Sequence, residues 1–342
     1  MSSNKVVSSA ASNKNASNTP SSSISSVAHK KPKVAENSDD PLIITVCVDV
    51  YKKNKEIRDA KNAHRANIKE TNLFLDSKLL TFQRIGKQPH KRFVVGFFEE
   101  GKFIPLIHIL KRYMFETDDR EKAYREARKI LKKIETSYLK PNEKRRAGCI
   151  TRHYGTWIRS SIYPFTISST TTPTERECNF HENKILPLQF ILNKIAGEAL
   201  EQYHPDIAQR YTDLVLPSNC TLKQRYWQVM HLNLKRRNAR GEPEEQDVQG
   251  GKHSGTVWEH HDRHDVKYGF CACFVLGNFG GGELTFPDLG IICEAEPGDL
   301  IFFNAFHLDH LNLPLNNDSK GKIADRNSII LYTDHNIFPT RE

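Results

Sequence analysis

The sequence predicts an α+β protein in which helices support a β-barrel-like core. From Gly269 onward, short apolar segments follow one another and are separated by Gly and Pro turns. Many short strands at near-regular spacing are typical of an antiparallel sandwich or barrel. Two segments with apolar residues at helical spacing precede this region. The chain has 342 residues, of which 38% are hydrophobic and 27% charged, so it can bury a sizeable core.

Each strand is expected where an apolar segment lies between turn residues. In the last third of the chain, the expected strands cover residues 270–276, 283–286, 291–294, 299–303, 310–313 and 327–333. The breaks between them include Gly280 to Gly282, Pro287 and Pro297. Further strands are expected at 42–48 and 226–234, and a hairpin at 91–98 and 102–109 turns at Gly101.

Two helices are expected before the strand-rich region. Asp118 and Asp119 open the first, Pro141 ends it, and its apolar stripe consists of Tyr124, Ala127, Leu131, Ile134 and Tyr138. The second begins near Pro187 and stops before Pro205, and its apolar stripe consists of Ile191, Leu192, Ile195, Ala199 and Tyr203.

Composition divides the chain into three parts. Residues 1–40 are dominated by Ser, Asn, Ala and Lys and are expected to form a disordered tail, because they cannot bury enough apolar surface to offset their ordering entropy. Residues 41–225 are expected to form an α/β region that packs on the core. Residues 226–342 are expected to form the core itself, with a Gly-rich loop at 235–256.

The cysteines and the N-terminus indicate an intracellular protein. Seven scattered cysteines contain no CxxC pair, which argues against a disulfide framework and against a zinc ribbon. No apolar segment is long enough for a membrane span, and the N-terminal residues lack the apolar region of a signal peptide. Residues 29–34 resemble a short basic nuclear-import signal, so the expected location is nuclear.

Positive charge is concentrated in one segment. The chain carries a formal charge of +9, and residues 120–146 contain eleven Lys or Arg and four Glu. A segment of this kind attracts polyanions, and nucleic acid is the commonest one in cells. A solvated helix face is the alternative. Nucleic acid is therefore a candidate partner of the helix within 120–146.

Seven histidines lie in the last ninety residues and include candidate metal ligands. His260 and Asp262 form an H-x-D pair, and in a strand both side chains would project from one face. His310 or His307 could supply the third ligand, while His261, His264 and Asp265 offer competing pairings. Two imidazoles and one carboxylate suit a non-haem Fe(II) oxygenase, although a zinc hydrolase could use similar ligands.

An arginine, Arg326, follows His310 by sixteen residues. In an alternating strand, Arg326 and Ser328 face the same side as Ile330 and Tyr332. The planar guanidinium grips a carboxylate through two parallel hydrogen bonds, which suits the distal carboxylate of 2-oxoglutarate. A structural arginine at a strand start is the alternative.

Together these motifs resemble those of the 2-oxoglutarate/Fe(II) oxygenases. The resemblance covers about residues 226–338. Within this superfamily, the sequence is most similar to the TET/J-binding-protein-like branch, whose members oxidise methyl groups of thymine or 5-methylcytosine. The residues that carry it are His260 to Asp265, Gly269 to Ala272, Gly277 to Leu284, Pro287 to Gly290, Pro297 to Asp299, His310, Arg326 and Ser328.

The resemblance implies both a fold and a site. The fold would be a double-stranded β-helix, or jelly roll, and the activity a dioxygenase that hydroxylates a C–H bond with Fe(II), 2-oxoglutarate and O2. Iron would be bound by His260, Asp262 and His310. Arg326 would bind the 2-oxoglutarate carboxylate with help from Ser328, and the substrate would be a methyl group on a nucleic-acid base.

Two features depart from that branch and leave other functions open. The cysteine-rich zinc module of the TET proteins is absent, and residues 41–225 match no known pattern. A prolyl-type protein hydroxylase of the same superfamily is one alternative, although these enzymes usually bind the cosubstrate with Lys. A catalytically inactive jelly roll that binds nucleic acid is another, although it would have no reason to keep the whole ligand set.

Overall fold

A computed structural model describes most of the chain beyond residue 90. The described residues are 40–46, 49, 52, 82–86, 90–137, 149–157, 165–166, 179–216, 224–235, 246–248, 251–253, 260–316 and 325–337. The expected disordered tail, the import-like segment and most of the loop at 235–256 lie outside them, so these stay predictions. No helix in the described part is long and apolar enough to cross a membrane.

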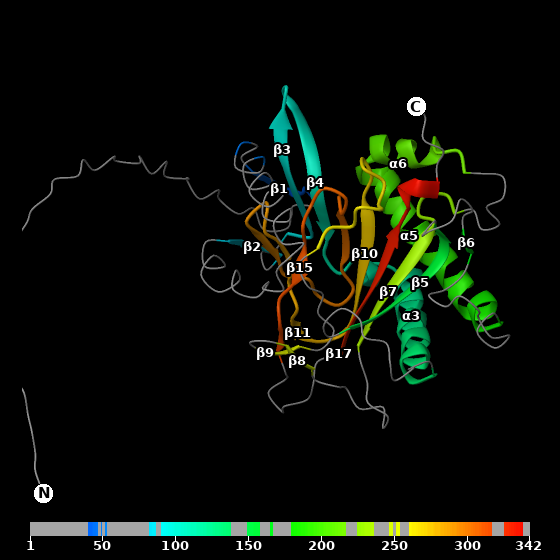
Figure 1. The fold of residues 1–342 in the computed structure, drawn as a ribbon. Helices are drawn as coiled ribbons and strands as arrows, with labels where there is room; N and C mark the ends of the chain where they lie inside the picture. Colours follow the sequence, from blue (N-terminus) through cyan, green and yellow to red (C-terminus); the bar gives the residue numbers. More distant parts are fainter. Residues whose placement is uncertain are drawn as a thin grey trace, which may run out of the picture. The chain divides into compact units, whose positions relative to one another are not determined.

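The largest element is a mixed sheet of nine strands (Figure 1). In order across the sheet they are β1 (Leu42–Thr45), β3 (Arg92–Glu99), β4 (Lys102–Leu110), β14 (Leu300–Phe303), β10 (Cys271–Asn278), β17 (Asp325–Tyr332), β7 (Val229–Lys235), β5 (Cys149–Trp157) and β6 (Phe165–Thr166). Only the β1–β3 pairing is parallel within this sheet.

A smaller sheet of four strands lies against one half of the large sheet. Its order is β15 (Leu311–Asn312), β12 (Leu284–Phe286), β13 (Ile291–Cys293) and β2 (Gln83–Ile85). Two strand pairs complete the β structure, β11 (Gly280–Gly281) with β16 (Leu315–Asn316) and β8 (Gln246–Val248) with β9 (Gly251–His253). Side chains of both sheets form one apolar core, which includes Val275, Phe286, Ile301 and Phe303. This face-to-face packing confirms the predicted α+β fold with a jelly-roll core.

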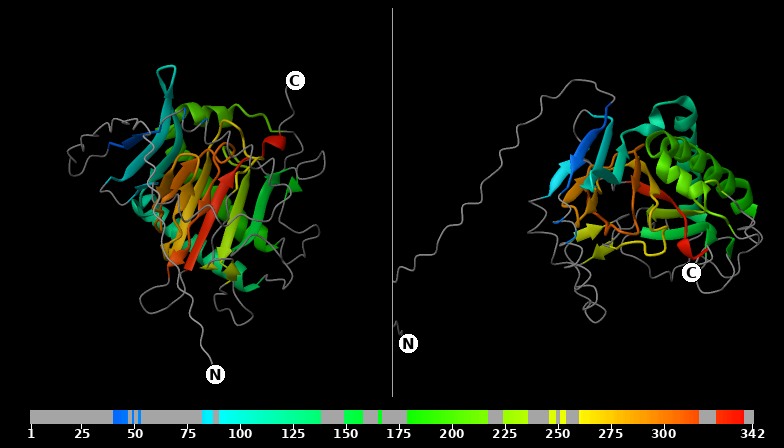
Figure 2. Two further views of the ribbon diagram at one scale, coloured as in Figure 1. Left: turned by 60° about the vertical axis from the view of Figure 1, so that its left-hand side comes forward. Right: turned by 90° about the horizontal axis from the view of Figure 1, so that it is seen from above.

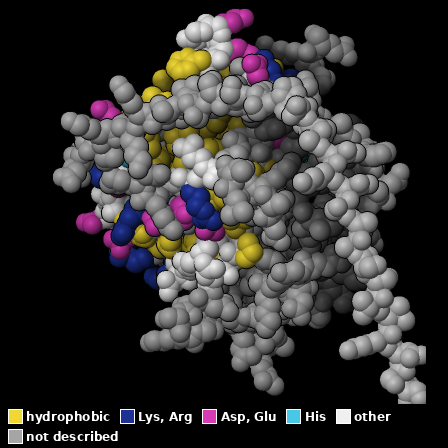
Figure 3. Space-filling view, turned by 90° about the vertical axis from the view of Figure 1, so that its left-hand side faces the viewer, with side chains coloured by type: hydrophobic (Ala, Val, Ile, Leu, Met, Phe, Trp, Pro, Cys, Tyr) yellow, Lys and Arg dark blue, Asp and Glu magenta, His cyan; other side chains and the backbone are white. Residues whose placement is uncertain are grey.

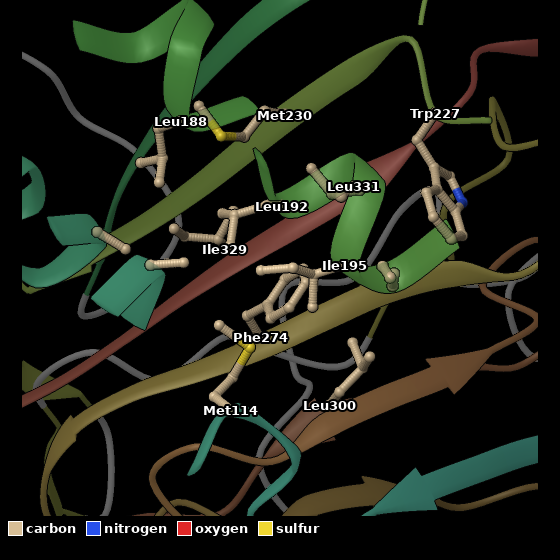
Figure 4. Close-up of a cluster of buried hydrophobic side chains, with 14 of the residues drawn as sticks. Met114, Leu188, Leu192, Ile195, Trp227, Met230, Phe274, Leu300, Ile329 and Leu331 are labelled. Atoms are coloured by element: carbon tan, nitrogen blue, oxygen red, sulfur yellow. The ribbon is translucent and has the colours of Figure 1, made fainter. Parts of the chain in front are cut away.

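Helices cover the other face of the large sheet, as Figure 2 shows from two further directions. They are α3 (Asp118–Ser137), α5 (Leu186–Tyr203) and α6 (Pro205–Thr212), with a π-helical turn at His181–Ile185 and 3₁₀ turns at Tyr113–Phe115 and His335–Ile337. In Figure 4, Leu188, Leu192 and Ile195 of α5 face Phe274 and Ile329 of the sheet. Alternation along the strands therefore divides their side chains between two cores.

The two regions expected on either side of residue 225 are not separate layers. β3, β4 and β5 come from the first region, and they pair directly with β14 and β7 from the second. The region that was expected to pack on the barrel instead supplies strands to its main sheet, because backbone groups at the edges of β14 and β7 need hydrogen-bond partners. Strands from both regions thus belong to one continuous main sheet.

Candidate active site

Three predicted ligands come together at one end of the barrel. The ligand atoms of His260, Asp262 and His310 all lie within 4.8 Å of one another. Asp262 lies between the histidines: its two carboxylate oxygens are 3.8 Å from His260 Nε2 and 3.8 Å from His310 Nε2. Since metal bonds to such atoms are about 2.1 Å long, one ion can bridge a separation of this size.

Backbone pairing places these side chains. His260 and His310 form an isolated antiparallel bridge, and each N–H donates to the carbonyl of the other, at 3.0 and 2.8 Å. The N–H of Asp262 donates to the carbonyl of Ala305 at 2.9 Å. Two segments about fifty residues apart in sequence are therefore fixed to each other at the point where the ligands project.

The surroundings of His310 leave its Nε2 atom available to bind a metal ion. Its Nδ1 lies 3.1 Å from the carbonyl oxygen of Leu308, which can only accept, so this nitrogen carries the hydrogen. The Nε2 atom then keeps its lone pair toward Asp262. Burial, together with the nearby His260, lowers the pKa of His310 to about 4, so its imidazole is neutral near pH 7.

The competing histidines lie elsewhere. His307 is outside the three-residue cluster and has its ring 6.3 Å from that of Tyr268. His264 stacks on His335 at 6.1 Å. The Nδ1 of His261 donates to Asp309 at 2.8 Å, and its Nε2 accepts from Arg263 Nε at 2.8 Å. The structure therefore favours His310 over His307 as the third member.

Asp265 is buried at the end of the same segment, and it forms an isolated β-bridge with Asp334. Burial, reinforced by the charges of Asp262 and Asp334, raises the pKa of the Asp265 carboxyl well above its usual range. The charged form of Asp265 is thus disfavoured beside the cluster, and Asp262 is the carboxylate placed between the two imidazoles.

Arg326 lies inside the barrel, at the other end of β17 from Asp334. Only 3% of it is exposed, and its guanidinium lies 5.6 Å from the centre of the Phe279 ring. A Cβ atom on Gly282 would lie 2.9 Å from Arg326 Cδ, so a glycine is needed there for the arginine to fit. A desolvated guanidinium is costly unless an anion or a set of acceptors satisfies it.

Ser328 faces the same interior as Arg326. It is buried, and its hydroxyl accepts a hydrogen bond from Asn233 Nδ2 at 3.4 Å. The register explains the contact, since Ser328 lies opposite Asn233 between β17 and β7. Sequence reasoning did not identify Asn233, because only the strand pairing brings it next to Ser328.

A second group missed by sequence reasoning lies on the neighbouring strands. His153 of β5 and His231 of β7 are directly opposite each other, and their rings stack with centres 4.1 Å apart. His153 Nδ1 is 3.2 Å from the hydroxyl of Tyr332, two residues before Asp334. These three side chains form what we term the polar wall, a hydrogen-bonding surface at the end of β17 nearer Asp334.

The residues present fit both an iron ion and 2-oxoglutarate. Two imidazoles and one carboxylate with converging ligand atoms match the donor set of mononuclear Fe(II) oxygenases. The buried guanidinium of Arg326, in the space that Gly282 leaves, matches a dicarboxylate that would extend from such an ion. His260, Asp262 and His310 would hold the ion, and Arg326 and Ser328 the cosubstrate.

Ion pairs partly neutralise the positive charge of α3, which is the helix expected within 120–146. Arg125 pairs with Glu121 at 2.7 Å, Lys129 with Glu126 at 3.6 Å, and Arg128 with Asp325 at 3.3 Å. Within α3 the sequence has seven basic and five acidic residues, a net charge of +2. Residues 138–146, where four more basic residues lie, are outside the described residues.

Solved structures that are similar to this chain include 2OG-Fe(II) oxygenase family proteins. Neither a family model nor a curated protein matches the sequence. The structure is similar to that of NgTET1 in complex with 5mC DNA, with 12% identity, a TM-score of 0.46, and coverage of 86% of this chain and 93% of the other. It is also similar to a 2OG-Fe(II) oxygenase family protein from Burkholderia pseudomallei, with 11% identity, a TM-score of 0.36, and coverage of 87% and 96%.

A further similar structure is a viral collagen prolyl hydroxylase from Paramecium bursaria Chlorella virus-1. It has 10% identity and a TM-score of 0.32, and the match covers 66% of this chain and 94% of the other. The chain is therefore similar in structure to 2-oxoglutarate/Fe(II) oxygenases, the group that its sequence motifs resemble. The side chains of the site, rather than these similarities, indicate the activity.

Proposed function

We propose that the protein is a 2-oxoglutarate- and Fe(II)-dependent dioxygenase that hydroxylates a methyl group on a nucleic-acid base. The observation that carries this proposal is the convergence of His260, Asp262 and His310 within 4.8 Å inside a jelly roll that also buries Arg326. A zinc hydrolase would use similar metal ligands but would not need a buried arginine clamp.

Each residue of the site has a separate role in the proposed reaction. The three ligands hold the metal on one side, which leaves positions open for the cosubstrate and oxygen. Arg326 binds and orients the distal carboxylate of 2-oxoglutarate through a charge-assisted fork, and Ser328 adds a hydroxyl beside it. When bound, Fe(II) and 2-oxoglutarate supply the oxidising chemistry: O2 is reduced, 2-oxoglutarate loses CO2 to become succinate, and one oxygen atom enters the substrate C–H bond.

The apolar walls of the barrel limit access of water to this centre. Phe286 and Phe303 lie close to His310, with ring centres 6.4 and 4.9 Å from the centre of its imidazole ring. Excluding water protects a reactive centre from side reactions and strengthens the interaction of Arg326 with a carboxylate. The protein thereby positions the reactants and shields them.

The polar wall supports a base rather than an aliphatic side chain as the substrate. His153, His231 and Tyr332 bring aromatic rings and hydrogen-bonding atoms together at the end of β17 nearer Asp334. A planar heterocycle offers complementary donors and acceptors and a face that can stack. A base in duplex DNA would have to be flipped out of its stack to reach this position.

Succinate formation tests the proposal directly. The full chain is incubated with Fe(II), 2-oxoglutarate and O2, together with methylated or unmethylated oligonucleotides of the same sequence or with a proline-containing peptide. We expect the methylated oligonucleotide to stimulate succinate formation and to gain the mass of one oxygen atom. Stimulation by the peptide alone would contradict the base substrate, and metal-dependent hydrolysis without any succinate would contradict the oxygenase activity.

A further inference from the structure

An exposed aromatic ring between two cations lies next to the candidate active site. Tyr268 is 60% exposed, and Lys267 Nζ and Arg210 Cζ lie 5.2 and 6.0 Å from the centre of its ring. His307 borders the same ring at 6.3 Å. We term these four residues the Tyr268 surface. Arg210 lies on α6, and Lys267 and Tyr268 lie in the segment just before β10.

The ring and the cations are held in place by backbone contacts. Arg210 of α6 donates from Nη1 to the carbonyl of Tyr268 at 3.3 Å. Asn304 Nδ2 donates to the carbonyl of Lys267 at 3.1 Å. The N–H of Gly269 donates to the carbonyl of Val266 at 3.0 Å, which closes the turn. A large aromatic side chain is thus presented to solvent on a fixed backbone, without packing in either core.

Acids as well as cations lie near this surface, since Asp206 and Asp213, four residues before and three residues after Arg210, are exposed. Asp265, Asp309 and Asp334 are 6, 7 and 3% exposed, whereas Lys267 and Arg210 are exposed. On the face drawn in Figure 3, Lys and Arg also lie beside Asp and Glu among the described side chains. The Tyr268 surface is distinguished by an exposed aromatic ring that has two cations at 5.2 and 6.0 Å from its centre.

The position of this surface ties it to the site. Tyr268 follows the ligand Asp262 by six residues, a span of at most about 20 Å, and His307 precedes the ligand His310 by three, at most about 11 Å. A polymer bound at the Tyr268 surface would thus pass within a few monomers of the metal position. The proposal below deepens the proposed function, since it names how the substrate strand is held.

We propose that the Tyr268 surface binds a single-stranded or locally unpaired nucleic-acid segment. One base would stack on the ring of Tyr268, and the flanking phosphates would contact Arg210 and Lys267. Stacking needs an unpaired base because the faces of paired bases are covered by their neighbours. An aromatic platform with adjacent cations satisfies both parts of a nucleotide, whereas the ion-paired arginines of α3 offer charge without a platform.

Binding without catalysis tests this inference. The full chain in EDTA, free of iron and 2-oxoglutarate, is titrated against a labelled single-stranded oligonucleotide of about twelve nucleotides, with anisotropy as the readout. Tyr268→Ala should weaken binding about tenfold, and Tyr268→Phe should keep most of the affinity because the stacking face remains. Lys267→Glu and Arg210→Glu should each weaken binding and flatten its salt dependence between about 50 and 200 mM.

A matched control is Arg125→Glu, an exposed arginine on α3 that should leave affinity near that of the wild type. Melting temperatures check that each variant is folded, and Lys267→Glu, a change at a solvent-facing side chain, serves if Tyr268→Ala is unstable. Equal binding by Tyr268→Ala and the wild type would overturn the inference. So would competition by polyglutamate as strong as that by unlabelled oligonucleotide, because it would indicate an acidic peptide as the partner.

The two proposals can fail separately. Oligonucleotide binding that depends on Tyr268, without any succinate formation in the complete assay, would leave this inference standing and remove the oxygenase. Succinate formation stimulated by a methylated oligonucleotide, together with unchanged binding in Tyr268→Ala, would leave the oxygenase standing and remove this inference.

Discussion

His260 and His310 each donate a backbone hydrogen bond to the carbonyl of the other, at 3.0 and 2.8 Å. This two-residue bridge joins the segment that carries Asp262 to the segment that carries His310. Their rings lie 4.3 Å apart as a result. The metal position is therefore determined by backbone pairing before any ion binds, and several variants should show this.

Replacing any of the three ligands should abolish iron binding. We expect His260→Ala, Asp262→Ala and His310→Ala each to lose Fe(II) in anaerobic equilibrium dialysis, because two ligands cannot hold the ion in an open site. His307→Ala should retain it, since this histidine lies outside the cluster. Iron loss in His307→Ala together with retention in His310→Ala would show that the third ligand is misassigned.

Arg326→Gln should raise the 2-oxoglutarate concentration needed for half-maximal binding by about 100-fold, because a charge-assisted bidentate contact is lost. Calorimetric titration of 2-oxoglutarate into the anaerobic Fe(II) protein measures this effect. Iron affinity should be unchanged, which separates a lost clamp from a collapsed site. An unchanged requirement for 2-oxoglutarate would leave a metal hydrolase as the better interpretation.

His261 should act as a positioning residue for the ligand segments. It connects Arg263 to Asp309, at 2.8 Å on each side, and Asp309 directly precedes His310. His261→Ala should weaken iron binding about 10- to 100-fold, as changes to the partners of metal ligands commonly do. Dialysis measures this, and His261→Asn, which can still donate and accept, should recover part of the loss. Equal losses in the two variants would argue against this role.

A buried histidine pair should make the fold sensitive to acid. His108 Nδ1 lies 2.8 Å from His204 Nε2 beneath the helices, and burial lowers the pKa values to about 3 and about 4. Below pH 6.5 the unfolded chain takes up protons that the folded chain does not. The free energy of unfolding should therefore fall by about 1 kcal/mol per pH unit for each histidine between pH 6 and 4.

Denaturant unfolding at pH 7 and pH 5 measures this dependence. His108→Gln should be less stable at pH 7, because it changes a packed site, and should lose less stability between the two pH values than the wild type does. If His108→Gln and the wild type lose the same free energy of unfolding between pH 7 and pH 5, other groups dominate the acid sensitivity.

Local patterns predicted much of the scaffold. The hairpin expected at 91–98 and 102–109 is β3 and β4, and the helix expected from Asp118 is α3. Both depend on contacts between neighbours in sequence, a turn at Gly101 and an apolar stripe. The strand expected at 327–333 is β17, which places Arg326 and Ser328 on one face. In each case the signal lies within about twenty residues.

The parts that sequence reasoning missed depend on distant pairing. β5 contains strand-favouring residues, among them Ile150 and Tyr154, but Arg152, His153 and Gly155 interrupt its apolar pattern. It forms a strand because its backbone pairs with β7 over seven residues. The polar wall was missed for the same reason, since His153 and His231 become neighbours only through that register.

The order of strands in the main sheet also has a consequence for how the chain folds. β17 comes after every other strand of the described chain, yet it lies between β10 and β7 in the interior of the sheet. Until residues 325–332 have left the ribosome, β10 and β7 would expose unpaired edges, which favour aggregation. A chain that ends before residue 325 would lack Arg326 and would also leave the sheet open in its middle. Completion of the main sheet therefore waits until β17 has been synthesised and inserted between β10 and β7.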